Sequence, residues 1–174
     1  MILKQKTSLK KIEYAISRLL KPLPDLPKAG RKWLANNIWW LVAIIVGLTV
    51  ISVLTLISNM LNILVISPRS LENVSLPLFN NIWFFSLSTS LTLAVSIVSL
   101  VIFVTAIAPL KAGLKKGWDL LFLILVVNTI WMVFRSFLSF DIFNISIYIL
   151  LGLFSSMVAA YFLFQIKSYF IRTK

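Results

Sequence analysis

Four long stretches of this chain carry no charged residue, and this pattern restricts the fold more than any other feature of the sequence. The residues are 60% hydrophobic and 13% charged, whereas roughly a quarter of a soluble domain is charged. A water-soluble fold could not cover so much apolar surface, but a lipid bilayer accepts it. We therefore predict an all-α integral membrane protein, because a helix satisfies its own backbone polar groups within lipid. The charge-free stretches are Trp33–Pro68, Asn73–Leu110, Leu120–Phe134 and Ile142–Ile166.

These stretches predict four transmembrane helices that form an up-down bundle. Pro68–Asn73 is expected to be a loop, and Pro77 and the pair Asn80–Asn81 are expected to delay the second span. Because the second span exceeds the roughly 20 residues that a bilayer core needs, it tilts or places its ends at the interface. Trp118 and Asp119 are expected to open the third span. The bundle covers residues 33–167, with spans at 37–61, 82–110, 118–137 and 145–166.

The basic residues gather in three groups, and their placement predicts the orientation of the chain in the membrane. Of 17 lysines and arginines, nine precede Trp33, three lie in Lys111–Lys116 and three lie in Lys167–Lys174. Cytoplasmic segments of membrane proteins carry an excess of these two residues. The three groups share one side of the membrane only if the number of spans is even, as hydropathy predicts. Both termini are therefore expected in the cytoplasm, with residues 168–174 as a basic tail.

Residues 1–32 precede the bundle and are expected to form an amphipathic helix and a proline-rich connector. In Thr7–Lys21, leucine and isoleucine recur at helical spacing on one face, and basic residues occupy the rest. Pro22, Pro24 and Pro27 end this helix, because proline lacks the backbone donor that a helix needs. The helix lies at the membrane interface or packs on the protein's own cytoplasmic loops, and the sequence leaves both interpretations open.

Two other roles for this N-terminal region are not expected. Nucleic acid is not an expected partner, because no interleaved aromatic residues accompany the basic ones. A cleavable signal peptide is not expected either, because the first thirty residues lack an apolar core and a small-residue cleavage site.

Five basic residues beside the expected spans are candidates for contact with anionic lipid headgroups. They precede the first span or lie in the loop between the second and third spans, so they could form one cytoplasmic patch. The alternative is that these charges only set the topology of the chain. The five residues are Arg31, Lys32, Lys111, Lys115 and Lys116.

Polar residues inside the second and third spans predict hydrogen bonds between helices. Ser88, Thr92 and Ser96 are spaced by four residues and form a stripe of hydroxyl groups on the second span. Asn128 and Thr129 lie near the middle of the third span, where a buried amide needs a hydrogen-bond partner. Hydroxyl groups of the second span are the expected partners of Asn128. The alternative is that these residues line a polar path for a small solute.

The fourth span carries a stripe of small residues, Gly152, Ser156 and Ala160, also spaced by four residues. Such stripes let the backbones of two helices approach closely. This face is expected to pack on the second span or on a second copy of the protein. A homo-oligomer or another membrane protein is therefore an expected partner, besides anionic membrane lipids.

The residue types that usually carry enzymatic chemistry are scarce. The chain has no cysteine and no histidine, which removes thiolate chemistry and the commonest metal ligand and general base. Its five acidic residues are scattered, and the sequence contains no motif for nucleotide binding, metal binding or a nucleophile. We expect no metal, no cofactor and no enzyme activity. An enzyme would need Asp119 or Glu72 to meet basic residues in a pocket, and Arg135 is instead expected to pair with Glu72 or Asp141 on the outer side.

Three segments carry a resemblance to known sequences: PLPDLPKAGRKW at Pro22–Trp33, KAGLKKGWDLLF at Lys111–Phe122 and YFLFQIKSY at Tyr161–Tyr169. They resemble a group of small, uncharacterised bacterial membrane proteins with four spans. The resemblance implies a bacterial inner-membrane location and implies no activity and no site residues.

From the residues themselves, we expect a non-enzymatic structural or assembly factor that acts through helix–helix and anionic-lipid contacts. The alternative is an oligomeric channel or transporter for a small solute that uses the hydroxyl-rich second span.

Overall fold

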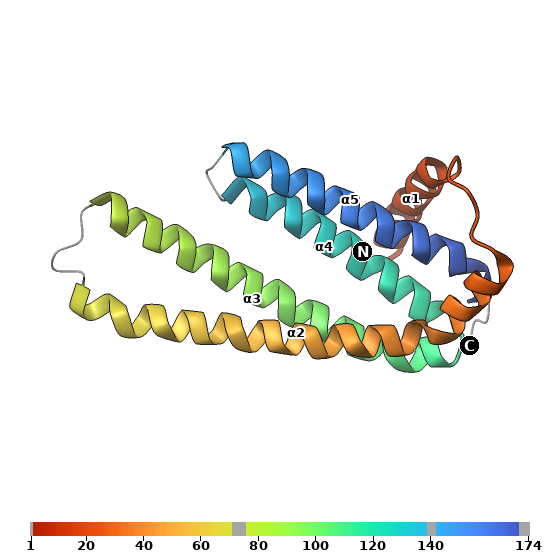
Figure 1. Cartoon of the computed structure of the whole chain (residues 1–174), viewed down its shortest axis with the longest axis horizontal. Coiled ribbons are helices and arrows are strands. Elements are labelled where there is room, and N and C mark those ends of the chain that lie inside the picture. Colours follow the sequence, from red (N-terminus) through yellow and green to blue (C-terminus); the bar gives the residue numbers. More distant parts are fainter. Residues whose placement is uncertain (1, 71–75, 139–141, 171–174) are drawn as a thin grey trace.

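The protein is a bundle of long helices preceded by one shorter helix (Figure 1). The computed structural model describes residues 2–70, 76–138 and 142–170, and it describes side chains for 9–62, 86–137, 146–147 and 149–170. The predicted all-α class is confirmed. The elements are α1 (Ile2–Leu20), α2 (Lys28–Ser70), α3 (Leu76–Lys111), α4 (Lys115–Leu138), α5 (Ile142–Ile166) and the short 3-10 helix η2 (Lys167–Tyr169).

Helices α2 to α5 are each long and apolar enough to cross a membrane, so the protein is a multi-pass membrane protein. At about 1.5 Å per residue, the 43 residues of α2 extend roughly 64 Å, and the 24 residues of α4 extend roughly 36 Å. Helices α2 and α3 accordingly project beyond α4 and α5 at one end (Figure 1). The membrane-spanning parts found among the described residues are Lys28–Asn62, Ser86–Lys111, Lys115–Phe137 and Ile149–Tyr169.

The ends of the first two spans differ from the sequence-based expectation. Helix α2 begins at Lys28, directly after Pro27, whose carbonyl accepts the Arg31 amide at 3.0 Å. It continues to Ser70, so the prediction that a loop begins at Pro68 is wrong. Helix α3 already begins at Leu76, because proline fits the first turn of a helix, where its missing donor breaks no bond. Glu72 and Asp141 lie outside the described residues, so their expected pairing with Arg135 stays a prediction.

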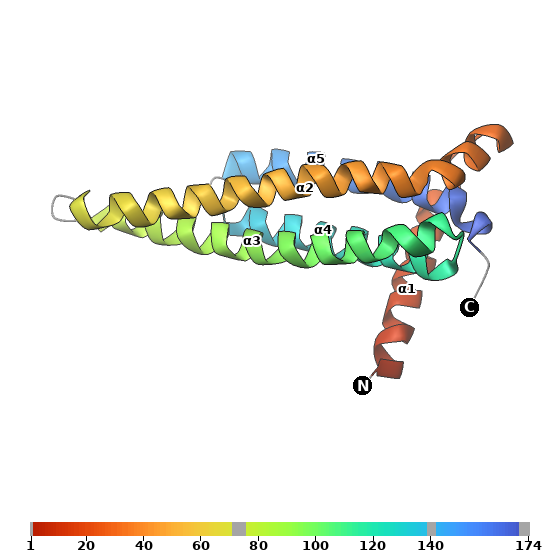
Figure 2. The same cartoon turned by 90° about the horizontal axis from the view of Figure 1, so that it is seen from below.

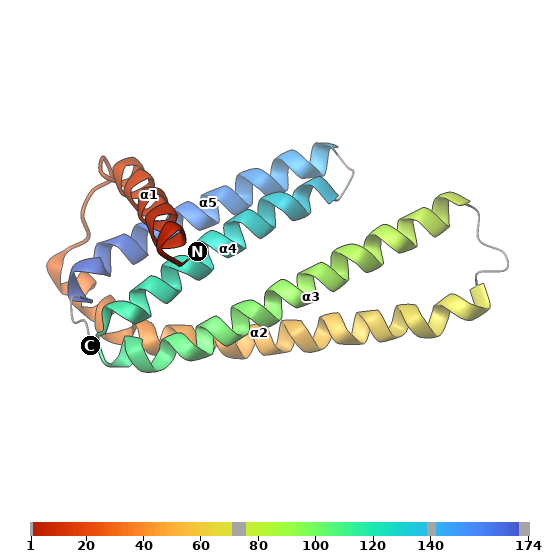
Figure 3. The ribbon, with the colours of Figure 1, turned by 180° about the vertical axis from the view of Figure 1, so that it is seen from behind.

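The buried core lies at one end of the bundle, which we call the basic end: the start of α2, the Lys111–Lys115 turn and the end of α5. The α2–α3 and α4–α5 pairs meet here and separate toward the opposite end (Figures 1 and 3). Helices α3 and α4 approach closely at this turn, where Gly113 has a φ of 65°. A Cβ atom at Gly117 would lie 2.7 Å from the Leu110 backbone nitrogen. The core cluster contains Ala35, Val42, Ala106, Leu110, Trp118, Leu121, Phe122, Leu163, Ile166 and Phe170.

Trp118, which was expected to open the third span, lies in the first turn of α4 and is the centre of this core. Its side chain is 1% exposed, and its indole Nε1 donates to the Leu163 carbonyl at 2.9 Å. Its ring stacks on Phe122, with centroids 5.4 Å apart, and meets the edge of Phe164 at 5.6 Å. The close turn at Gly117 places Trp118 in the interior, where an aromatic cluster joins α4 to α5.

Helix α1 docks on α5 and projects away from the bundle at a steep angle to the long helices (Figure 2). Ile12 and Ile16 pack against the core cluster, while Tyr14 on another face is 72% exposed. Lys167 of η2 forms an ion pair with Glu13 of α1. Helix α1 therefore rests on the spans themselves, and not on cytoplasmic loops as one interpretation of the sequence held.

The proline-rich connector binds the end of α5 as well. The Tyr161 hydroxyl donates to the Pro24 carbonyl at 2.7 Å, and the Gln165 amide donates to the Asp25 carboxylate at 3.2 Å. These bonds join residues about 140 positions apart in the chain. They hold the connector beside the basic end, where it forms one side of the candidate site.

Candidate functional site: a basic cavity

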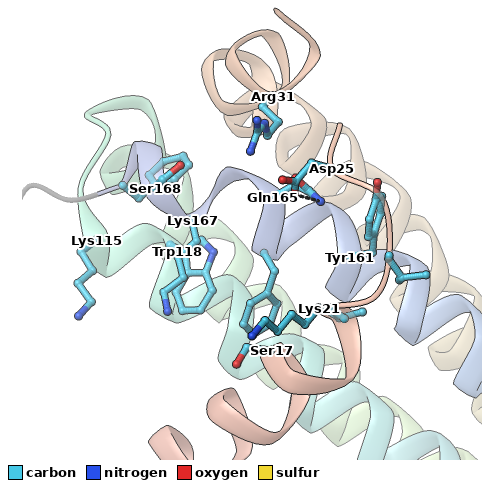
Figure 4. A pocket seen from close by; sticks show the side chains of 14 residues that line it. Ser17, Lys21, Asp25, Arg31, Lys115, Trp118, Tyr161, Gln165, Lys167 and Ser168 are labelled. Carbon is cyan, nitrogen blue, oxygen red and sulfur yellow. Dashed lines mark hydrogen bonds between the residues drawn. The ribbon is translucent and has the colours of Figure 1, made fainter. Parts of the chain in front are cut away.

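A cavity of about 780 Å³ lies at the basic end, where the end of α1, the connector and the starts of α2 and α4 meet the end of α5 (Figure 4). Four cations line it, contributed by four different segments of the chain. Trp118, Tyr161 and Phe164 form aromatic parts of the wall. Asp25 is the acidic residue of the lining. The cations are Lys21, Arg31, Lys115 and Lys167.

The cavity has a net positive charge. Lys167 pairs with Glu13 and lies over the Trp118 ring, 5.2 Å from its centroid. Four cations against the two carboxylates of Asp25 and Glu13 leave a net charge of two. Within the described part of the chain, no carboxylate pairs with the other three lining cations. An anion that enters the cavity therefore meets positive charge from several directions.

Arg31 is the least satisfied of these cations. Its side chain is half-buried, and its Nε atom is buried without a hydrogen-bond partner among the described residues. A buried donor left without a partner costs about 1–3 kcal/mol, and more when the group is charged. A guanidinium group also presents its donors as a planar fork that matches the oxygens of a phosphate or carboxylate. Arg31 is thus the residue that gains most from a bound anion.

The structure brings together two of the five residues that the sequence proposed for headgroup contact. Arg31 and Lys115 line the cavity. Lys111 lies instead over the Trp39 ring, 5.2 Å from its centroid. Lys32 and Lys116 are exposed and are not part of the cavity lining.

Sequence reasoning missed Lys21 and Lys167. Lys21 follows α1 and Lys167 begins η2, so 146 positions separate them in the sequence. The sequence around each of these two lysines predicts only a basic segment beside a membrane span. The sequence signal that could have indicated the site is the pair Tyr161 and Gln165, four residues apart at the end of the last span and followed by Lys167.

The polar residues within the spans mostly bond within the bundle. Thr92 donates to the Ser88 carbonyl of its own helix at 2.7 Å, and Ser96 is half-buried on the same stripe. The Ser99 hydroxyl donates to the Asn128 Oδ1 atom at 3.1 Å, which is the predicted kind of bond between the second and third spans. A hydroxyl group that donates to a carbonyl of its own helix cannot donate to a solute at the same time. This bond therefore favours helix packing over a polar path for a solute.

The small-residue stripe of α5 packs on α4. A Cβ atom at Gly152 would lie 1.5 Å from the Met132 Sδ atom, and Ala160 is 4% exposed. The Thr129 and Ser156 hydroxyl groups share a hydrogen bond of 3.0 Å. Within the chain, the partner of this stripe is therefore the third span and not the second span, and packing on a second copy of the protein stays a prediction.

The described residues contain no group of three histidine, cysteine, aspartate or glutamate side chains that could hold a metal ion. Asp119, which an enzymatic pocket would have needed, is exposed and does not line the basic cavity. Asp25, a residue of the connector, supplies the carboxylate there.

The fold and cavity together define a multi-pass helical membrane protein with a basic, aromatic-walled cavity at one end of its bundle. No protein-family model, curated protein or solved structure matches the chain. The resemblance to four-span bacterial proteins stays a prediction.

Proposed function

We propose that this protein is a non-enzymatic structural or assembly factor of the bacterial inner membrane that binds anionic lipid headgroups in its basic cavity. The observation that carries the proposal is that Lys21, Arg31, Lys115 and Lys167, from four segments of the chain, line one cavity. An anionic headgroup supplies the acceptors that Arg31 lacks. The position of the cavity supports a lipid source, because its cations border the charge-free spans at headgroup level.

The cavity wall suits a lipid headgroup better than a fully hydrated anion. Arginine binds phosphate oxygens with two parallel hydrogen bonds, and lysine adds a point charge. The half-buried Tyr161 offers apolar ring surface, which is typical of side chains at the boundary between water and hydrocarbon. Each lysine or arginine near an anionic membrane surface contributes about 1 kcal/mol. Several such contacts on one headgroup give a preference for anionic lipids over neutral ones.

The proposal requires the basic end to face the cytoplasm, and the absence of cysteine makes this testable. A single cysteine at position 116, introduced as Lys116→Cys, is expected to resist a membrane-impermeant maleimide in spheroplasts and to react in inside-out vesicles. Arg69→Cys, at the far end of α2, is the matched control and is expected to show the reverse. Labelling of Lys116→Cys from the outside would contradict the orientation and the leaflet assigned to the lipid.

The cavity itself is tested by removing two of its cations. In nanodiscs that mix phosphatidylglycerol and phosphatidylcholine, the variant Arg31→Gln with Lys115→Gln is expected to retain at least about tenfold less phosphatidylglycerol. Hydrogen bonds to charged groups are worth about 1.5–3 kcal/mol each, so losing two of them reduces binding by this factor or more. The measurement is native mass spectrometry of the lipids that remain bound.

The matched control is Lys32→Gln with Lys116→Gln, which changes the net charge equally at exposed positions outside the cavity. This control is expected to retain nearly the lipid of the unmodified protein. An equal loss in both double variants would mean that general surface charge attracts the lipid, and the cavity would lose its assigned role.

A further inference from the structure

A second hollow, with a volume of about 560 Å³, lies between α1, α4 and α5. Its lining is apolar apart from Thr129 and Ser156, whose hydroxyl groups bond to each other. The Thr129 hydroxyl also bonds to the Leu125 carbonyl of its own helix at 2.7 Å. We call this hollow the α1 groove. Its lining, with these hydroxyls paired, suits a hydrocarbon chain better than a polar ligand.

The α1 groove lies deeper in the membrane-spanning region than the basic cavity. On α4 the cavity is lined by Lys115 and Trp118, whereas the groove is lined by residues 125–130. On α5 the cavity begins at Tyr161, and the groove ends at Ala160. Both hollows therefore lie along the same face of the α4–α5 pair, the groove at hydrocarbon depth.

Helix α1 separates the two hollows and presents a different side to each. Ser17 borders the basic cavity, Ile12 and Leu19 line the groove, and Leu20 borders both. The helix also projects across the direction of the spans (Figures 2 and 3). This is the orientation of an amphipathic helix that lies in the membrane interface with its apolar side toward the hydrocarbon.

Two cations flank the groove side of α1. Lys11 precedes Ile12 and Arg18 precedes Leu19, and the seven-residue spacing places both cations on one edge of the helix. Both side chains are exposed. Leu19 is 70% exposed and Ile130, on the opposite wall, is 63% exposed, so apolar surface at the groove lies uncovered beside positive charge.

This combination distinguishes among possible occupants. A partner helix laid in the groove would pack its apolar side against Leu19 and bring Lys11 and Arg18 out of water, which costs free energy unless the charges are paired. A membrane phospholipid carries both the apolar chain and the paired anion in one molecule. We propose that the α1 groove holds one acyl chain of an anionic phospholipid from the adjacent leaflet, whose phosphate binds Lys11 and Arg18.

The proposal makes α1 a clamp that holds a lipid against the α4–α5 pair. It uses residues distinct from the cationic lining of the basic cavity, so it does not depend on the proposed headgroup site there. Snorkelling of the lysine and arginine side chains lets their charges reach the phosphate while α1 stays at the boundary of the hydrocarbon.

The test uses the full chain in phosphatidylcholine nanodiscs that contain phosphatidylglycerol with a spin label on one acyl chain. Electron paramagnetic resonance is expected to show an immobilised lipid component. Ile130→Trp fills the groove and is expected to reduce this immobilised component below that of the control variant Ile51→Trp. Ile51→Trp on α2 is the matched control, because Ile51 is 62% exposed and lies outside the groove. Both changes are at exposed positions, and circular dichroism checks that the helices remain.

A second pair of variants tests the phosphate contact. Lys11→Gln with Arg18→Gln is expected to reduce the preference for labelled phosphatidylglycerol over labelled phosphatidylcholine about tenfold. In the background of Arg31→Gln with Lys115→Gln, Ile130→Trp is still expected to reduce the immobilised component below that of Ile51→Trp, which separates this site from the basic cavity. Equal spectra for Ile130→Trp and Ile51→Trp would overturn the chain site, and an unchanged headgroup preference in the α1 variant would overturn the phosphate contact.

Discussion

Trp118→Ala is expected to destabilise the folded bundle by about 3–5 kcal/mol, the largest effect among the single substitutions considered. Trp118 is 1% exposed and its ring stacks on Phe122 at the point where α4 joins α5. Alanine removes this packing and the hydrogen bond from Nε1 to the Leu163 carbonyl. The measurement is the midpoint of unfolding in a mild detergent titrated with sodium dodecyl sulfate, followed by circular dichroism.

Two further variants define what Trp118 contributes. Trp118→Phe keeps an aromatic ring and loses the hydrogen bond, so its destabilisation is expected to be smaller, about 1–2 kcal/mol. Trp33→Ala removes a tryptophan that is 57% exposed, and a surface change of this kind is expected to alter the stability by about 0.5 kcal/mol or less. If Trp118→Ala and Trp33→Ala unfolded at the same detergent fraction, Trp118 would not be the centre of the core.

Gly152→Leu is expected to separate α4 from α5 and to destabilise the protein by about 2–3 kcal/mol. A Cβ atom at this position would lie 1.5 Å from the Met132 Sδ atom. Leucine adds three more carbon atoms to that contact, and the two helices must move apart to accommodate them. The same unfolding titration measures the effect.

Gly47→Leu on α2 is the matched control, because no atom lies within 4 Å of a Cβ atom placed there. It introduces the same side chain into a membrane-spanning helix at an open position. This variant is expected to be as stable as the unmodified protein or slightly more stable, since leucine has a better helix propensity than glycine. Equal destabilisation at both positions would contradict the close approach of α4 and α5. Gly152→Ala is expected to cost less than Gly152→Leu, because the flexible Met132 side chain can move aside.

The hydrogen bond between the second and third spans shows which part of such a contact the sequence can predict. An amide at mid-span needs a partner, and a helix rich in hydroxyl groups was the evident source. The bond from Ser99 to Asn128 agrees with that expectation. The particular serine was not among the residues named for the stripe, because the register between two helices depends on their packing. The same limit explains why the stripe at Gly152 was assigned to the wrong neighbour.

The candidate site was less accessible to sequence reasoning than the fold. Arg31 and Lys115 were identified as basic residues beside spans, and both line the cavity. Lys21 and Lys167 were not, because only the docking of α1 and the connector on the end of α5 brings them there. Lys111 has the same sequence signal as Lys115 but lies over Trp39 instead.

The sequence by itself determined the all-α class, the four spans and the proline-rich break between α1 and α2. These features depend on local quantities: the transfer of apolar side chains into lipid, backbone hydrogen bonds within one helix and the missing donor of proline. Only the tertiary structure decided that Trp118 is buried, that the stripe at Gly152 faces α4 and that α1 lies across α4 and α5. These features depend on contacts between segments far apart in the chain, and several helix faces of this protein are apolar enough that the pattern alone does not select among them.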